Sequence, residues 1–231
     1  MLPSGYRIKH EIVAIPGVPD LAIRSLLDRQ EFSDPDGAAD REGISSALWS
    51  LFGVVWPSGL QLAAWVARRP VRADERILEI GCGLAVASLV AHRRGALVTA
   101  SDCHPLAREF LEENVRLNSL APLPYCHANW DTGPEAEPGS AHGDQLSGRF
   151  DLIIGSDVLY ERDAAGALPH FIDRYLTPAG EVLIVDPNRG NRAAFHRRMA
   201  ALGYALTETR IEDPKAPGGP FRGRLLHYRR G

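Results

Sequence analysis

Two glycines, Gly81 and Gly83, mark the first place in the chain where ligand chemistry is expected. They lie between a short apolar run and a helical pattern, where a chain without a β-carbon can turn sharply and bring a ligand against the main chain. The amide groups at the start of the following helix would then face that ligand. A Gly-x-Gly turn also joins many strands to helices without any ligand, so its meaning depends on its neighbours.

Two acidic residues indicate which ligand the turn would prefer. Asp102 ends the next apolar run, about 20 residues on, where a carboxylate is placed to accept both hydroxyls of a ribose. A dinucleotide site would need a further glycine where this chain has Val86. Glu79 would repel phosphates but suits an ammonium group. The combination favours an adenosine–methionine ligand over NAD, and an NAD-dependent oxidoreductase is the disfavoured alternative.

Alternating strand and helix patterns after Pro70 predict the elements that position these residues. The predicted strands cover residues 76–80, 97–101, 125–129, 150–155, 181–186, 204–211 and 224–228. The predicted helices cover residues 58–69 (with Ser58 as N-cap), 84–94, 105–118, 164–176 and 191–202. Repeated β-α-β units imply an α/β fold whose mostly parallel seven-stranded sheet carries helices on both faces. Ligands bind such sheets beyond the carboxyl ends of the strands.

The first part of the chain has a different pattern. Residues 6–13 partly alternate apolar and polar side chains and residues 21–23 could return beside them, which predicts a hairpin. Residues 28–42 are polar and acidic and predict a surface loop. We therefore divide the chain into an N-terminal hairpin and acidic loop, residues 1–43, and a main domain, residues 44–231. Residues 131–149 predict a second long loop.

Composition excludes several classes of protein. The chain has 231 residues, of which 45% are hydrophobic, and a formal net charge of -3. This argues for a globular fold and against a surface that binds nucleic acid. We find no apolar run of membrane-spanning length and no secretory signal. The three cysteines and eight histidines show no metal-binding spacing, so we expect no metal site, no disulfide frame and a cytoplasmic location.

Together these motifs resemble a known group, the Rossmann-like class I S-adenosylmethionine-dependent methyltransferases. The likeness is greatest to the protein lysine methyltransferases that carry a D-x-x-Y motif after the fourth strand. It spans roughly residues 44–186, and its motifs stand here as Trp56-Pro57-Ser58-Gly59, Glu79-Ile80-Gly81-Cys82-Gly83, Asp102, Trp130 and Asp157-Val158-Leu159-Tyr160.

The resemblance implies S-adenosylmethionine as cofactor and a set of residues that contact it. These are Trp56, Glu79, Gly81, Cys82, Gly83, Asp102, Asn129, Trp130 and Ser156. Trp130 would offer a ring to the adenine, and Asn129 replaces an acid that the family often has there. Core packing of the tryptophans, and capping of the next helix by Asp102, are the alternatives.

The resemblance also implies that Asp157 and Tyr160 are catalytic. The Asp157 carboxylate can position an incoming amine and draw off its positive charge, and the Tyr160 ring can form a wall for a cation. A helical turn starting at Asp157 would aim both side chains at one opening. The alternative is that Asp157 caps a helix and Tyr160 packs beside it.

We therefore expect methyl transfer to a nitrogen, in the first place that of an exposed lysine on a partner protein, with no membrane or nucleic-acid partner. A small-molecule N- or O-methyltransferase and a non-catalytic cofactor-binding module are the alternatives. Residues 28–42 hold six acids against Arg29 and Arg41, and residues 131–148 hold four acids and no Lys or Arg. If these loops rim the opening, they favour a basic partner; otherwise they are solvated acidic loops.

We assign no catalytic role to two further features near the site. The sequence Asp186-Pro187-Asn188-Arg189 resembles the catalytic tetrapeptide of DNA amino-methyltransferases, but those enzymes carry it after the fourth strand, and we interpret it as a coincidence. His104 lies next to the ribose acid, and we interpret it as a solvated loop residue.

Overall fold

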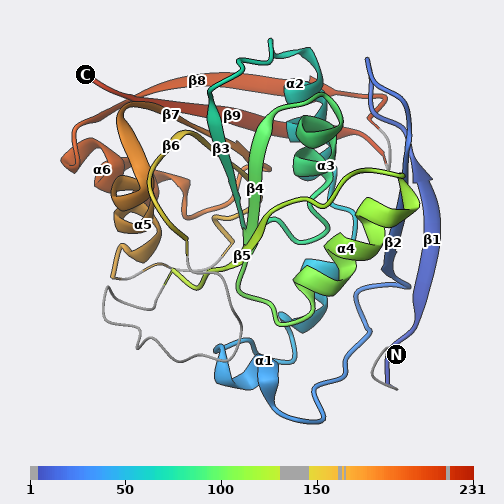
Figure 1. Cartoon of the computed structure of the whole chain (residues 1–231). Helices are drawn as coiled ribbons and strands as arrows, with labels where there is room; N and C mark the ends of the chain where they lie inside the picture. The colour runs from blue at the N-terminus through green and yellow to red at the C-terminus, as the bar shows by residue number, and fades with distance from the viewer. Residues whose placement is uncertain (1–4, 131–145, 161–162, 164, 217–218) are drawn as a thin grey trace.

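The computed structural model describes residues 5–130, 146–160, 163, 165–216 and 219–231. Its centre is a seven-stranded sheet with the order β5-β4-β3-β6-β7-β9-β8 (Figure 1). The strands are β3 (Arg76–Ile80), β4 (Leu97–Asp102), β5 (Tyr125–His127), β6 (Phe150–Ser156), β7 (Leu176–Asp186), β8 (Tyr204–Asp213) and β9 (Phe221–Arg230). The predicted α/β fold with a seven-stranded sheet is confirmed.

The strand order changes direction between β3 and β6, which places the binding edge of the sheet. Strands β3 to β7 pair in parallel, whereas β9 runs antiparallel to both of its neighbours, β7 and β8. The chain moves outward from β3 through β4 to β5, then returns to pair β6 on the other side of β3. Ligands of such sheets bind beyond the carboxyl ends of the strands at this switch.

Helices cover both faces of the sheet because the central strands are apolar on both sides. In β6, for example, Leu152 and Ile154 belong to one buried cluster and Ile153 to the other. The first cluster packs against α2 (Pro57–Arg68), α3 (Val86–Arg93) and α4 (Ala107–Leu117), and the second against α5 (Ala167–Tyr175) and α6 (Arg192–Ala201). Figure 1 shows α5 and α6 together on the side opposite α2 and α3.

The start of α2 differs from the prediction. Trp56, in an extended conformation, is the N-cap residue, and Pro57 occupies the first turn, where its missing N–H costs nothing. Ser58 is a buried residue inside the helix, so its prediction as N-cap was wrong. Pro57 is the better start signal, since its fixed φ already suits a helix.

Within the described part of the chain, one segment, Trp49–Arg68, is long and apolar enough by length and composition to cross a membrane. Because 56% of its 18-residue window is buried inside the fold, it packs as a core segment. It comprises the short 3-10 helix η1 (Trp49–Gly53) followed by α2, which contacts β6, β7 and β9.

The N-terminal hairpin is held by two asparagines, Asn114 of α4 and Asn118 at the C-cap of that helix. Strands β1 (Ile8–Val13) and β2 (Leu21–Leu26) pair antiparallel in a separate sheet. The Asn114 amide pairs with the backbone of Arg24, and the Asn118 amide with the backbone of Ala22, through both the N–H and the C=O group in each case. One turn apart on α4, these side chains act as a neighbouring strand would and leave the edge of β2 paired.

The acidic segment after the hairpin is more ordered than the loop that was predicted. It contains a short helix, α1 (Ala38–Arg41), whose first amides are bound by the Asp34 carboxylate at 3.0 Å. Glu31 is buried and forms an ion pair with Arg7, 2.8 Å long. These contacts fix the segment that leads into η1.

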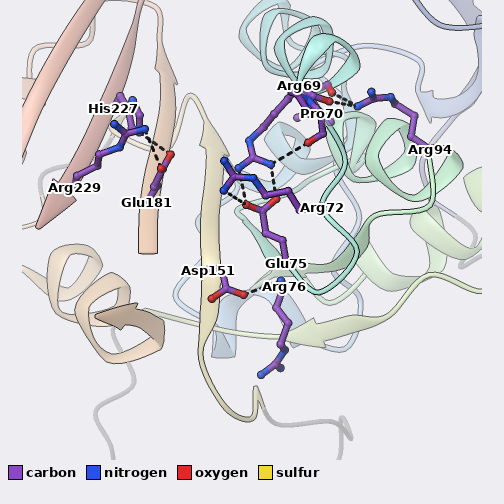
Figure 2. Close-up of polar contacts among 11 residues, drawn as sticks. Arg69, Pro70, Arg72, Glu75, Arg76, Arg94, Asp151, Glu181, His227 and Arg229 are labelled. Atoms are coloured by element: carbon purple, nitrogen blue, oxygen red, sulfur yellow. Dashed lines mark hydrogen bonds and ion pairs between the residues drawn. The ribbon is translucent and has the colours of Figure 1, made fainter. Parts of the chain in front are cut away.

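The amino end of β3 carries a buried ion-pair network, far from the carboxyl ends of the strands (Figure 2). Arg69 holds the Glu75 carboxylate through two guanidinium nitrogens, of which Nη2 lies 2.6 Å from Oε1. Arg72 approaches the same carboxylate at 3.4 Å. The side chains of Arg69 and Glu75 are 13% and 7% exposed, so neither charge is well solvated. Arg94 ties this network to the end of α2 by donating to the Arg69 carbonyl at 2.7 Å.

Replacing Glu75 by alanine is expected to lower the free energy of unfolding by about 3 kcal/mol, because the Arg69 guanidinium would remain buried without its counter-ion. Glu181 provides the control, since it pairs with His227 and the well-exposed Arg229 (Figure 2). Glu181→Ala should cost less than about 1 kcal/mol. Chemical denaturation measures both values, and equal losses in the two variants would contradict the assignment of a buried pair.

Candidate active site

A cavity of about 480 Å³ opens at the carboxyl ends of the strands, where the strand order switches. Its size falls in the usual range for small-molecule sites. Every residue predicted to bind cofactor or to act in catalysis lines it: Trp56, Glu79, Gly81, Cys82, Gly83, Asp102, Asn129, Trp130, Ser156, Asp157 and Tyr160. Residues from the first part of the chain, Arg29, Glu42 and Gly43, line it as well.

The glycine turn after β3 has a geometry that larger residues would not tolerate. Gly81 and Gly83 both adopt positive φ, 55° and 51°. A β-carbon on Gly83 would lie 2.7 Å from the carbonyl oxygen of Phe52, and one on Gly81 would touch Val158 and the Trp130 ring. Between them, Cys82 is buried, and burial raises the pKa of its thiol well above the usual value. Cys82 therefore serves as a small, protonated filler of the turn.

Asp102 holds this turn to the loop after β4. One carboxylate oxygen accepts the Gly83 N–H and the other accepts the His104 N–H, both at 2.8 Å. Burial raises the pKa of this carboxyl group, although the two backbone donors act in the opposite direction. Helix α4 begins only at Ala107, with no side chain capping it, so Asp102 does not act as its N-cap.

Glu79 is a buried carboxyl group at the end of β3. It accepts hydrogen bonds from the backbone N–H and the hydroxyl of Ser88, in the first turn of α3. Burial raises the pKa of Glu79 to about 7, while the Ser88 hydrogen bonds oppose this rise. The group is therefore poised to gain or lose a proton near neutral pH, according to what occupies the cavity.

The indole groups of Trp56 and Trp130 both line the cavity. Trp56 donates its Nε1–H to the Leu51 carbonyl at 2.8 Å, and the Arg29 guanidinium lies 6.0 Å from the centre of its ring. Trp130 lies against Gly81, 3.4 Å from the position of a β-carbon there. Both rings line the cavity as well as packing against the protein, so packing and ligand contact coexist in this geometry.

Asn129 connects the loop after β5 to the N-terminal segment. Its side-chain amide donates to the backbone carbonyl of Glu42 at 3.2 Å and to the Glu42 carboxylate at 3.3 Å. The same carboxylate reaches His127 of β5 at 3.3 Å. The residues just after α1 are thereby fixed at the cavity wall.

The loop after β6 presents Asp157 in an unusual conformation. Its φ is 55°, in the left-handed region that non-glycine residues seldom adopt, and its N–H is bound to the Val185 carbonyl at 2.9 Å. Residues 157–160 do not form the helical turn considered for them, yet Asp157 and Tyr160 both line the cavity. Tyr160 is 41% exposed, which places its ring at the solvent end of the cavity.

Arg189, which the sequence interpretation set aside, is the main residue that it missed. Its Nε donates to Oδ1 of Asp157 at 2.7 Å, and its Nη2 donates to Oδ2 at 2.8 Å. The end of β7 brings the tetrapeptide 186–189 beside the end of β6, because these strands are neighbours in the sheet. This contact could have been predicted from the expected position of β7 next to β6 in the sheet.

The interpretation of His104 as a solvated loop residue was wrong. It is 3% exposed, stacks on Phe52 with 3.6 Å between ring centres, and meets the edge of Trp49. Burial lowers the pKa of its imidazole to about 3, so the ring is neutral at physiological pH. The sequence around His104 indicates a loop, but Trp49 and Phe52 of η1 pack against its ring and bury it.

The donors and acceptors of the cavity fit the ligand that the resemblance implies. Glu79 can accept from an ammonium group, Asp102 can accept from ribose hydroxyls, and the Gly81–Gly83 turn leaves room for a ligand against the backbone. Among the described residues, no cluster of three or more His, Cys, Asp or Glu side chains could hold a metal ion.

Comparison with known proteins gives consistent matches. A family model described as lysine methyltransferase matches residues 45–200. An electron transfer flavoprotein beta subunit lysine methyltransferase of Xenopus laevis is 29% identical over 91% of this chain and 82% of its own length. Its counterpart in Danio rerio is 31% identical over 64% of this chain, a match that spans about half, 55%, of that relative.

Solved structures show the same fold at lower identity. The magnesium protoporphyrin IX methyltransferase of Synechocystis PCC 6803, with bound S-adenosylmethionine, superposes with a TM-score of 0.58 and 14% identity. The superposition covers 87% of this chain and 100% of that one. The chain thus shares the overall fold of that protein.

Proposed function

This chain belongs to the lysine methyltransferase family, and on that premise we propose that it methylates a lysine side chain of a partner protein in the cavity described above. The observation that carries the proposal is the meeting of two kinds of residue in one cavity. The buried carboxyl groups of Glu79 and Asp102, suited to an ammonium group and a ribose, line the same cavity as Asp157 and the exposed Tyr160.

The cofactor-binding part of the proposal rests on the turn after β3 and the loops beside it. Glu79 and Asp102 would hold the ammonium and ribose groups of S-adenosylmethionine, and Trp130 would pack against its rings. When bound, this cofactor supplies a methyl group on a positively charged sulfur. An amine nitrogen can bond to that methyl carbon while the bond from carbon to sulfur breaks. Gly81 and Gly83 allow close approach to the backbone.

The acceptor part rests on Asp157 and Tyr160. A lysine side chain reaches the cavity as an ammonium ion and must lose a proton before its nitrogen can attack. The Asp157 carboxylate attracts that cation, orients the nitrogen and offers an acceptor for its proton. The Tyr160 ring would flank the approaching side chain, where its π-face favours a cation. Holding the nitrogen in line accounts for most of the rate gain expected in such a displacement.

The role of Glu79 predicts a proton release when the cofactor binds. With a pKa of about 7, Glu79 is roughly nine-tenths protonated at pH 6, and a bound ammonium group would favour its charged form. Ionisation of Glu79 on binding should therefore contribute a release of about 0.9 proton at pH 6 and of about 0.1 proton at pH 8, taken as the difference between wild type and Glu79→Gln. Isothermal titration in buffers of different ionisation enthalpy measures this quantity. Glu79→Gln should abolish the release; the same release in wild type and variant would contradict the role.

Two proteins are the first acceptors to test: the electron transfer flavoprotein beta subunit, for which the Xenopus laevis relative is named, and calmodulin. A calmodulin-lysine N-methyltransferase of Arabidopsis thaliana is 28% identical over 66% of this chain and 52% of its own length. The full chain is incubated with S-adenosylmethionine and each protein, and the acceptor is then analysed by intact and peptide mass spectrometry. We expect methyl groups on lysine in one of the two. Transfer to small amines alone, with both proteins and a complete protein extract unmodified, would contradict the proposal.

A further inference from the structure

The ion pair between Arg189 and Asp157 occupies the carboxylate to which the proposed function brings the acceptor lysine. Both oxygens of Asp157 are bound, at 2.7 and 2.8 Å, by two nitrogens of one guanidinium group. Such a bidentate, charge-assisted pair is stronger and more directional than a simple contact of opposite charges. Asp157 is therefore already neutralised by a residue of its own chain.

The loop that carries Arg189 is built to present it. The carboxylate of Asp186, itself fully buried, accepts the backbone N–H of Arg189 at 3.1 Å. Asn188, with φ of 64°, turns the chain between them and accepts a hydrogen bond from Arg224 at 3.1 Å. The backbone of Arg189 is thus anchored, while its side chain reaches across to the loop after β6.

The burial of the two partners differs, and this decides which one can move. The side chain of Asp157 is 10% exposed and that of Arg189 is 40% exposed. Asp157 is also fixed by its backbone bond to Val185. The guanidinium, on a long side chain with one side in water, can leave Asp157 and be solvated, whereas the carboxylate stays at the cavity wall.

A carboxylate that holds a guanidinium attracts a second cation weakly. The lysine ammonium of an acceptor would have to approach Asp157 against the charge of Arg189, which is always protonated. Either the two cations exchange at Asp157, or the pair persists and the amine is bound elsewhere. The exposure of Arg189 favours exchange.

We propose that Arg189 is an internal competitor for Asp157, which the acceptor ammonium must displace. This inference rests on the proposed role of Asp157 and adds a positioning residue that sets the threshold for acceptor binding. An acceptor that is held by further contacts with this chain can displace Arg189 from Asp157, whereas a weakly bound amine cannot. Arg189 thus contributes to selectivity through Asp157.

The test uses n-butylammonium, which reproduces the end of a lysine side chain. Its binding to the full chain, saturated with S-adenosylhomocysteine, is measured by isothermal titration. Arg189→Gln removes the competing charge and should bind the probe about fivefold more tightly than wild type, the gain expected from losing a partly exposed ion pair. Arg189→Lys keeps a cation there and should restore affinity close to that of wild type.

The double variant Asp157→Asn, Arg189→Gln identifies the site of the gain, since it should lose the tighter binding. Damage to the structure would weaken binding and cannot produce a gain. Equal or weaker binding in Arg189→Gln overturns the inference, as does a gain that persists in the double variant. Failure of the proposed function is separate: it would appear as absent protein methylation by the wild type, whatever Arg189 does.

Discussion

Replacing Asp157 by alanine is expected to reduce methyl transfer at least about 1,000-fold while leaving S-adenosylmethionine affinity within about threefold of wild type. The side chain contacts Arg189 and lines the cavity, whereas most of the cofactor-binding residues lie at the carboxyl ends of β3, β4 and β5 or just after them. Removing the carboxylate takes away the group that attracts and orients the amine and accepts its proton. Single-turnover transfer and cofactor titration on the same preparation measure the two effects.

The control for this variant addresses the strained backbone of Asp157. Because φ is 55° at this position, alanine adds conformational strain as well as removing charge. Asparagine tolerates the left-handed region better and keeps the shape of the side chain. Asp157→Asn should therefore fold like wild type and still lose transfer. Full activity in Asp157→Asn, or a parallel loss of cofactor binding and transfer, would contradict the assigned role.

Asp102→Ala is expected to lower S-adenosylmethionine affinity by a factor of at least about 100. The variant loses the acceptor proposed for two ribose hydroxyls, and each hydrogen bond to a charged group contributes about 1.5–3 kcal/mol. It also frees the amides of Gly83 and His104, which Asp102 holds at 2.8 Å, so the turn would be less well ordered before binding. Isothermal titration with S-adenosylhomocysteine measures the loss without turnover.

Asp151 offers a matched control at the opposite end of the sheet. Its carboxylate accepts the Arg76 backbone N–H at 3.0 Å, a contact of the same kind at the start of β3 and β6 (Figure 2). Asp151→Ala should cost stability but leave cofactor affinity unchanged. If both variants lose affinity equally, the effect of Asp102 is one of general stability and the proposed ribose contact is wrong.

Residues at strand ends could be predicted to meet because parallel strands deliver their carboxyl ends to one edge. Gly81, Asp102, Asn129 and Ser156 each lie at or just after the carboxyl end of a different strand, so their convergence on one cavity needs only the alternating strand and helix pattern. The sharp turn at Gly81 and Gly83 could also be predicted, because a Gly-x-Gly pair between a strand and a helix indicates such a turn. The structure shows positive φ at both glycines and a close approach to Phe52 and Val158.

Contacts that depend on strand neighbours or on covering segments could not be predicted in this way. Arg189 lies 32 residues from Asp157, and its role appears only when β7 is placed beside β6. His104 looks solvated in its own loop, because the rings of Trp49 and Phe52 that bury it come from a distant segment. Glu42 reaches the cavity for the same reason, through Asn129.

Identification of the methylated product decides whether this chain methylates lysine. The full chain is incubated with S-adenosylmethionine carrying a labelled methyl group and with a protein extract, and the labelled protein is then hydrolysed to amino acids. We predict that the label is recovered in methylated lysine with wild type and is absent with Asp157→Asn. Label in small molecules, in nucleic acid or in methylated arginine, with none in lysine, would contradict the account.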